Sequence, residues 1–264
     1  MNLLNRYFTL LVSYMKANWR SALEYRANFL FETLLSVLEI GMYLFYWKLF
    51  FGITGSIGGT SYEQLVALIA FNHVIYAALD TVMGNHIWDA SGLIIKGQLD
   101  LFLVQPASPI FQLFFSGAQP LRAVQVLTGT AVYFFIMPIT PGTVGLYLFG
   151  VAAGAVIFGS WLISIHALTF RFGNDLVVIK LMSVILHFAK KPATIFSGVV
   201  RFILYTAIPA AYLGTVQAEQ AMNPTVGAIL GLAALAIIAP LIATTLFRRG
   251  MRLYESGNLI GARM

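Results

Sequence analysis

The residues best able to do chemistry in this chain are four ionisable side chains that lie within long apolar stretches. Glu32 and Glu39 are seven residues apart, and so are His73 and Asp80, so each pair shares one face of a helix. Ionisable groups inside a membrane span often mark a transport path. Glu39, His73 and Asp80 are therefore candidate residues of a water-filled translocation pathway, in which Glu39 and His73 could also pair. The alternative is that they form interhelical hydrogen bonds that only fix packing.

The sequence carries no recognisable motif for catalysis, for metal binding or for nucleotide binding. It has no H-E-x-x-H cluster and no cysteine, and we interpret His166 and His187 as packing or interfacial residues. It also has no G-x-x-x-x-G-K-[ST] motif and no Gly-Lys pair, so it lacks the loop that cradles nucleotide phosphates. We expect no enzyme activity, no metal site and no cofactor in this chain.

The composition indicates a polytopic α-helical membrane protein. Of 264 residues, 59% are hydrophobic and 10% are charged, and the mean hydropathy is +0.83. Soluble domains carry about 25% charged residues, so a water-exposed surface would be largely bare hydrocarbon. The net charge of +6 is better explained by membrane topology than by nucleic-acid binding, because the basic residues cluster at the ends of apolar segments.

Six apolar segments have the length or composition of transmembrane helices. Before them, residues 1–20 mix basic and apolar residues at helical spacing and predict an interfacial helix, although a first span that begins early is the alternative. Residues 192–218 are apolar but broken by Gly198, Arg201 and Pro209, which predicts short re-entrant or interfacial helices on the outer side. The six expected spans are approximately 27–51, 62–85, a part of 111–137, 144–170, 176–188 and 226–247.

The distribution of basic residues predicts the orientation. Most of them fall on the side that holds both ends of the chain, so both termini are expected in the cytoplasm. Lys190 and Lys191 fall on the outer side in this scheme. If these two lysines were cytoplasmic, the fifth segment would become a hairpin and the number of spans would change.

The most polar interruption of the chain is the cytoplasmic segment 86–109. Its sequence from Ile94 to Pro109 carries turn-forming and charged residues between long apolar runs. Such a segment is expected to meet a partner on the water side. An ordinary interfacial loop without a partner is the alternative.

Five short motifs, in this order and spacing, together resemble one family. With an interfacial N-terminal helix and six spans, the chain resembles the membrane subunit of a type-2 ATP-binding-cassette (ABC) exporter, and more narrowly the stand-alone permeases of daunorubicin- and viologen-type export systems. The motifs are Tyr25-Arg26-Ala27-Asn28-Phe29, Ile95-Lys96-Gly97-Gln98-Leu99-Asp100 running into Leu103-Val104-Gln105-Pro106, Pro192-Ala193-Thr194-Ile195-Phe196, Ile208-Pro209-Ala210-Ala211-Tyr212 and Tyr254-Glu255-Ser256-Gly257.

The resemblance implies that segment 86–109 contains a coupling helix that rests in a groove of a separate ATPase. Asp89 and its neighbours would begin the helix, Lys96-Gly97 would end it, and a second turn would run from Gln98 to Val104. Part of the segment would supply apolar contacts with the ATPase, and Asp100 and Lys96 would supply the polar rim around them. The coupling residues implied are Asp89, Lys96, Gln98, Leu99, Asp100, Phe102 and Leu103, with Leu99, Phe102 and Leu103 as the apolar anchors.

The sequence therefore predicts a single permease domain, residues 1–264, that forms half of an exporter in the bacterial plasma (inner) membrane. The resemblance implies three kinds of partner: ATP-binding-cassette ATPases that hold ATP and Mg, a second permease that is identical or paralogous, and membrane lipids. It also implies efflux, such as multidrug or xenobiotic export. The alternatives are an ion-coupled secondary transporter, which should show internal repeats with charges at matching positions, and a membrane-embedded protein that does not transport.

Overall fold

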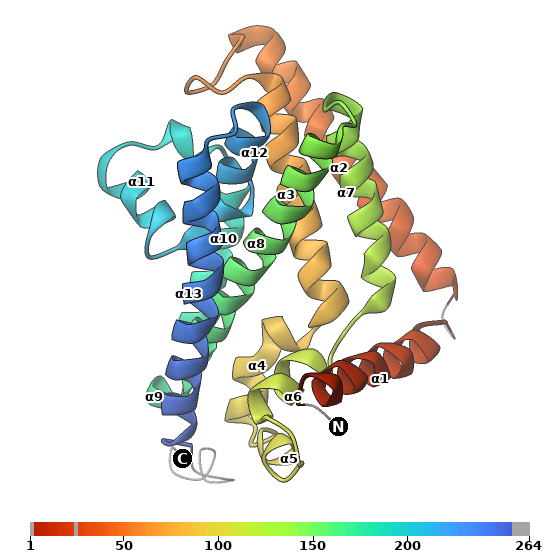
Figure 1. Ribbon diagram of the computed structural model, residues 1–264, viewed down its shortest axis with the longest axis vertical. Coiled ribbons are helices and arrows are strands. Elements are labelled where there is room, and N and C mark those ends of the chain that lie inside the picture. The colour runs from red at the N-terminus through yellow and green to blue at the C-terminus, as the bar shows by residue number, and fades with distance from the viewer. Residues whose placement is uncertain (1–2, 24–25, 255–264) are drawn as a thin grey trace.

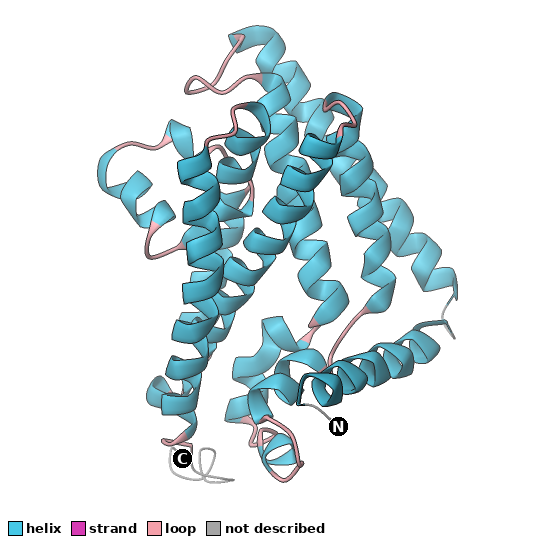
Figure 2. Ribbon diagram, viewed as in Figure 1, coloured by secondary structure: helices cyan, strands magenta, loops and turns pink. Residues whose placement is uncertain are grey.

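The computed structural model describes residues 3–23 and 26–254, and within them every regular element is a helix (Figure 1, Figure 2). Two parts of the quoted motifs, Tyr25 and Glu255 to Gly257, lie outside the described residues. The all-α class is thus confirmed for the described part of the chain. The helices that correspond to the six expected spans are α2 (Arg26–Thr54), α3 (Tyr62–Val82), α7 (Ala123–Ile136), α8 (Pro141–His166), α10 (Leu176–Ala189) and α13 (Val226–Met251).

Four of the described helices are long and apolar enough to cross a membrane. They are α2, α3, α8 together with the short α9 (Thr169–Phe172) that follows it, and α13. The other two expected spans are shorter: α7 with the 3-10 turn η1 (Pro120–Arg122) before it, and α10. At a rise of 1.5 Å per residue, the 14 residues of α10 cover only about 21 Å. A count of six complete spans therefore remains a prediction.

The elements outside the six expected spans gather at the two opposite ends of the bundle (Figure 1). At one end lie α1 (Leu3–Leu23), α4 (His86–Ile95), α5 (Asp100–Leu103) and α6 (Pro109–Phe115), with α1 running across the ends of the long helices. At the other end lie the loop 55–61 and the broken segment that follows α10. That segment consists of η2 (Ala193–Ile195), α11 (Gly198–Tyr205), η3 (Pro209–Leu213) and α12 (Thr215–Met222).

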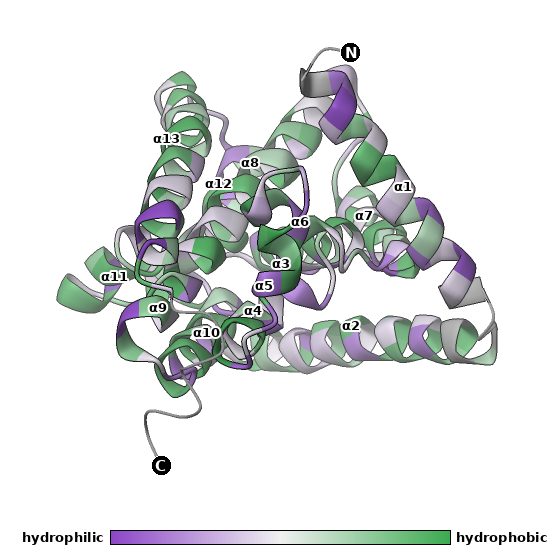
Figure 3. Cartoon of the chain, turned by 90° about the horizontal axis from the view of Figure 1, so that it is seen from below, coloured by the Kyte–Doolittle hydropathy of each residue, from purple (hydrophilic) through white to green (hydrophobic). Residues whose placement is uncertain are grey.

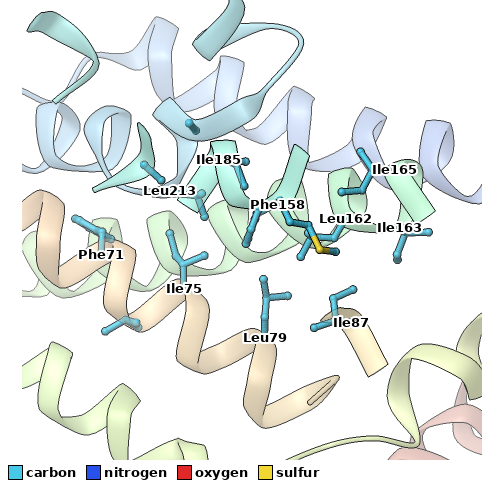
Figure 4. Packing of buried hydrophobic residues seen from close by; sticks show 14 of the residues in the cluster. Phe71, Ile75, Leu79, Ile87, Phe158, Leu162, Ile163, Ile165, Ile185 and Leu213 are labelled. Carbon is cyan, nitrogen blue, oxygen red and sulfur yellow. The ribbon is translucent and has the colours of Figure 1, made fainter. Parts of the chain in front are cut away.

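The core is built around α3. Its apolar residues continue around the whole helix, which is typical of a helix buried on all sides, and 67% of its most apolar stretch is buried. Phe71, Ile75 and Leu79 of α3 face Phe158 and Leu162 of α8 in the close view (Figure 4). These contacts hold α3 against α8; His73 lies on α3 and His166 at the end of α8.

Two long helices, in contrast, expose most of their apolar surface. Only 22% of the apolar stretch of α2 and 11% of that of α13 is buried. From the α1 side, both helices are predominantly hydrophobic, whereas α1 carries hydrophilic and hydrophobic residues together (Figure 3). Apolar helices with so little cover require lipid or another protein around them.

A glycine turn ends α3 and starts α4. Gly84 has a φ of 58°, a left-handed conformation that costs glycine little. A Cβ at this position would overlap the carbonyl oxygen of Gly117, so the site also needs glycine for space. We expected this span to continue to Asn85. The turn explains why α3 stops at Val82 instead.

Candidate functional site

The cytoplasmic segment expected between the second and third spans is fastened to the helical body along one face of α4. Ile87, Ala90 and Ile94 have no exposed surface, and their spacing of three and four residues places them on one side of a helix. Leu99, after the end of α4, is equally buried. The segment is therefore a fixed projection of the body.

A buried chain of hydrogen bonds joins α4 to the end of α8. Thr169 donates to the Ser91 hydroxyl (2.7 Å), which lies 2.7 Å from Nδ1 of His166, and Nε2 of His166 lies 2.8 Å from the carbonyl oxygen of Ile87. Because the carbonyl only accepts, Nε2 carries the proton, and Nδ1 accepts from Ser91. His166 has no exposed surface and Ser91 only 3%, so neither can be satisfied by water instead. Of the two roles expected for His166, packing or interfacial, its full burial agrees with packing, and its hydrogen bonds also join α4 to α8.

The N-terminal helix holds the other side of the segment. Arg6 donates to the carbonyl oxygen of Pro106, and the Tyr7 hydroxyl accepts from the backbone N–H of Ser108 at 3.2 Å. Further along α1, the Tyr14 hydroxyl donates to Gln112 at 3.2 Å. Thus α1 supports α6 along its length, and the loop after α5 is tied down at Pro106.

Between these two attachments, the turn α5 presents apolar side chains to the outside. Leu101 is 64% exposed, Leu103 44% and Val104 83%. Three exposed apolar residues on a rigid projection form the kind of patch that contacts another protein. We call residues 101–104 the apolar tip.

The seven residues expected to contact an ATPase differ in their exposure, so not all of them can reach a partner. Leu99 is buried and therefore not available at the surface, and Phe102 is half-buried, with its ring 6.1 Å from that of His86. Leu103 and three of the polar residues are exposed, namely Asp89, Lys96 and Gln98. Leu101 and Val104 were not among the predicted coupling residues, yet they supply most of the exposed apolar surface.

The start of α4 also differs from the expectation. The helix begins at His86 with Asn85 as its N-cap residue, so Asp89 lies within the first turn. An acidic side chain there still interacts favourably with the helix dipole. The end of α4 agrees with the prediction: Lys96 is the C-cap residue and Gly97 has a φ of 73°.

Asp100 brings two of the quoted motifs together across the chain. Its carboxylate lies next to Tyr254, and burial, together with this carboxylate, raises the pKa of Tyr254 to about 12. The Tyr254 ring also lies 6.1 Å from the ring of Phe170. The chain after α13 therefore lies against the base of α5.

A second candidate site lies at the middle of α2, where a small cavity of about 40 Å³ is lined by polar and apolar groups. A cavity needs roughly 10–15 Å³ to hold one water, so this one has room for water. Nε2 of His73 lies 3.3 Å from Ser36 and 3.3 Å from Thr128. The residues that line the cavity are Glu39, Ile40, Tyr43, Ile69, Asn72, His73 and Lys190.

Within this site the charge of Glu39 is balanced by Lys190. Oε1 of Glu39 lies 3.5 Å from Nζ of Lys190, and these side chains are 68% and 45% exposed. Glu39 is 13 residues after the start of α2 and 15 before its end, so the ion pair lies at the level of the middle of a long apolar helix. The placement of Lys190 on the outer side remains a prediction; the structure adds that this lysine pairs with a residue near the middle of α2.

Asp80 does not belong to this cavity. Its Oδ1 accepts a 2.6 Å hydrogen bond from the Trp88 indole, and its backbone carbonyl accepts from the N–H of Gln119 at 3.0 Å. These contacts place Asp80 near the α4 end of α3. The structure thus brings together Glu39 and His73, adds Lys190, and separates Asp80 from them.

Lys190, Ser36 and Thr128 were missed by sequence reasoning. The signal that could have identified Lys190 is the length of its segment. A segment too short to span the membrane places a lysine at its end below the membrane surface. Ser36 and Thr128 are small polar residues that are common in membrane helices. Their meeting at His73 depends on how α2, α3 and α7 pack.

A family model described as "ABC-2 family transporter protein" matches residues 37–257 of the chain. The matched part includes the residues of both candidate sites apart from Ser36 and the supporting residues of α1, Arg6, Tyr7 and Tyr14. Neither a curated protein nor a solved structure matches the chain.

Proposed function

The chain belongs to the ABC-2 family of transporter proteins, and we propose that it is the permease subunit of an ATP-driven exporter, with the apolar tip as the contact for a separate ATPase. Permeases of this family are membrane proteins that pair with ABC ATPase subunits and do not themselves hydrolyse ATP. The proposed ATPase holds ATP and Mg, and this chain holds neither.

The observation that carries the proposal is the exposed apolar tip on a rigid base. Leu101, Leu103 and Val104 face outward at the end of the molecule that carries α1. Apolar anchors surrounded by polar groups are the usual composition of a protein contact. In the proposed contact, Lys96 and Gln98 supply the polar rim, and Leu99 and Phe102 hold the tip in place from within.

Movement of the ATPases is proposed to reach the spans through α4. The hydrogen bonds among Ser91, Thr169 and His166 connect α4 directly to the end of α8. A rigid connection transmits a push as a rotation or shift of whole helices. Closure of the ATPases would therefore move α8, together with the helices that pack on it, between inward- and outward-facing arrangements.

The translocation pathway is proposed to run along the face that carries Glu39, His73 and Lys190. Charged groups facing hydrocarbon at the centre of a bilayer are unfavourable, yet the Glu39 and Lys190 side chains are exposed on the single chain. A water-filled path between this chain and a second permease, identical or related, would hydrate them. The segment 192–218 would then close the outer end of that path.

The finer features of the proposal rest on the sequence resemblance and on the distribution of basic residues. We place a single permease domain with six spans in the bacterial inner membrane, with both termini in the cytoplasm and the tip on the cytoplasmic side. Membrane lipids surround α2 and α13 where the second permease does not. The relationship to daunorubicin- and viologen-type systems, and efflux of drugs or other xenobiotics, belong to the proposal.

Co-purification from native membranes tests the ATPase contact. Leu101→Asp with Val104→Asp places two charges on the apolar tip, and we expect the permease to lose its bound ATPase. Ile139→Asp is the matched control, because Ile139 is 76% exposed but lies in the loop between α7 and α8, at the opposite end. Melting temperatures of the purified variants show whether the fold is retained.

The competing function is an ion-coupled transporter that works alone. An ATPase that stays bound to the folded double variant would rule out the apolar tip as its contact. Transport by the purified chain, driven by a proton gradient without any ATPase, would rule out the proposed function itself.

A further inference from the structure

A large cavity lies between α3, α8, α13 and α6, and Ser108 is the one lining residue that was named above in a candidate site. Its volume is about 500 Å³. The lining is mostly apolar, and its aromatic wall comes from Phe111 and Phe115 of α6. Water in a space lined by so many apolar groups is unfavourable, so an apolar occupant fits it best.

One end of this cavity carries a cation. Arg248 is the only charged residue among the described residues that line it, and its side chain is exposed. Arg248 lies three residues before the end of α13 at Met251, at the membrane-surface end that also carries α1 and α6. Among the hydroxyl groups that line the cavity, Thr244 is engaged within α13, donating to the carbonyl oxygen of Pro240 at 2.7 Å.

The cavity thus combines an apolar slot with a positive charge at its mouth. Arg248 lies eight positions after Pro240, the other end of the lining of α13, which is roughly 12 Å along the helix axis. This geometry matches an amphiphile whose chain enters the membrane from a charged headgroup at its surface. Basic pockets between membrane helices commonly bind anionic headgroups.

We propose that this cavity is a specific site for an anionic phospholipid of the leaflet on the α1 side, with an acyl chain between α3, α8 and α13 and its phosphate at Arg248. Guanidinium groups form paired, charge-assisted hydrogen bonds with phosphate oxygens. The proposal rests only on membrane embedding and the cavity, and it is independent of the ATPase contact.

Native mass spectrometry of the detergent-purified protein tests the site. Dioleoyl phosphatidylglycerol is titrated against dioleoyl phosphatidylcholine, which has the same chains but no net charge. We expect tighter binding of the anionic lipid to the unchanged protein. Arg248→Gln should weaken that binding roughly fivefold, whereas Arg249→Gln should not, because Arg249 is also exposed but does not line the cavity.

A second pair of variants tests the acyl slot. Val156 lines the cavity and is 42% exposed, and Leu148 on the same helix is 60% exposed but does not line it. Val156→Phe should reduce binding of both lipids, and Leu148→Phe should leave it unchanged. Melting temperatures verify that each variant is folded, and if Val156→Phe does not fold, the two arginine variants decide.

Several results would overturn the proposal. Equal losses for Arg248→Gln and Arg249→Gln would show only diffuse attraction to a basic surface, and equal binding of the two lipids would remove the role of charge. A change of oligomeric state in Val156→Phe without a change in lipid binding would show that a second copy of the chain occupies the cavity.

Discussion

At the residue scale, two of the polar groups that define the candidate sites, Glu39 and His166, have partners that are far away in the sequence. Glu39 meets Lys190, which is 151 positions away in the sequence, and His166 meets Ser91, which is 75 positions away. The sequence suggested that Glu39 and His73 could lie near each other, and both line the small cavity beside α2. It could not identify Lys190, Ser91 or Thr169, because those contacts depend on tertiary packing.

Replacing His166 by alanine is expected to lower stability. The Ser91 hydroxyl would keep no acceptor in a fully buried place, and an unsatisfied buried polar group costs about 1–3 kcal/mol. Ser164→Ala is the control, since the Ser164 hydroxyl donates only within its own helix, to the Ser160 carbonyl oxygen. Thermal unfolding of the purified proteins measures both changes. Equal melting temperatures for the two variants would contradict the joining role of His166.

Exchanging the charges of Glu39 and Lys190 tests their pairing. Glu39→Lys or Lys190→Glu alone would place two like charges near each other, and we expect the melting temperature to fall by a few degrees. The double exchange should recover most of that loss, because the pair is re-formed in reverse. If the double variant is as unstable as the sum of the single ones, the two side chains do not interact.

At the element scale, the sequence predicted the long helices well and the short ones less well. Apolar length located α2, α3, α8 and α13, and the limits of α10 agree with the expected 176–188 within one residue. The start of α4 was placed too late, because the turn at Gly84 is fixed by contact with Gly117, and Asp89 offered a plausible but unused N-cap. Within the apolar tip, Leu101 and Val104 were missed because helical periodicity cannot show which face of a one-turn helix is covered.

The turn at Gly84 supplies a prediction about the junction of α3 and α4. Gly84→Ala should destabilise the protein by more than about 2 kcal/mol, since it combines an unfavourable left-handed residue with a steric overlap. Gly145→Ala in α8 is the comparison, because a Cβ there meets no atom within 4 Å and alanine favours a helix. The amount of folded protein after purification and its melting temperature report the difference. A stable Gly84→Ala variant would show that the turn tolerates a side chain.

At the scale of the whole molecule, the single chain is incomplete as a transporter. It exposes an ion pair at the level of the middle of α2 and apolar side chains at a tip outside the bundle. Composition predicted membrane embedding, and the missing nucleotide motif predicted an outside source of energy. The structure adds where apolar and charged side chains are exposed, along α2 and at residues 101–104, and these are the surfaces that we propose for a second permease and an ATPase.

The central claim is that an ATPase binds at the apolar tip, and site-directed cross-linking tests it most directly. The chain has no cysteine, so a single cysteine at Val104 can carry a photoactivatable group in native membranes, and one at Ile139 serves as the comparison. The account predicts that illumination links position 104, and not position 139, to a protein that mass spectrometry identifies as an ABC ATPase. Absence of an ABC ATPase from the products at position 104 would contradict the account.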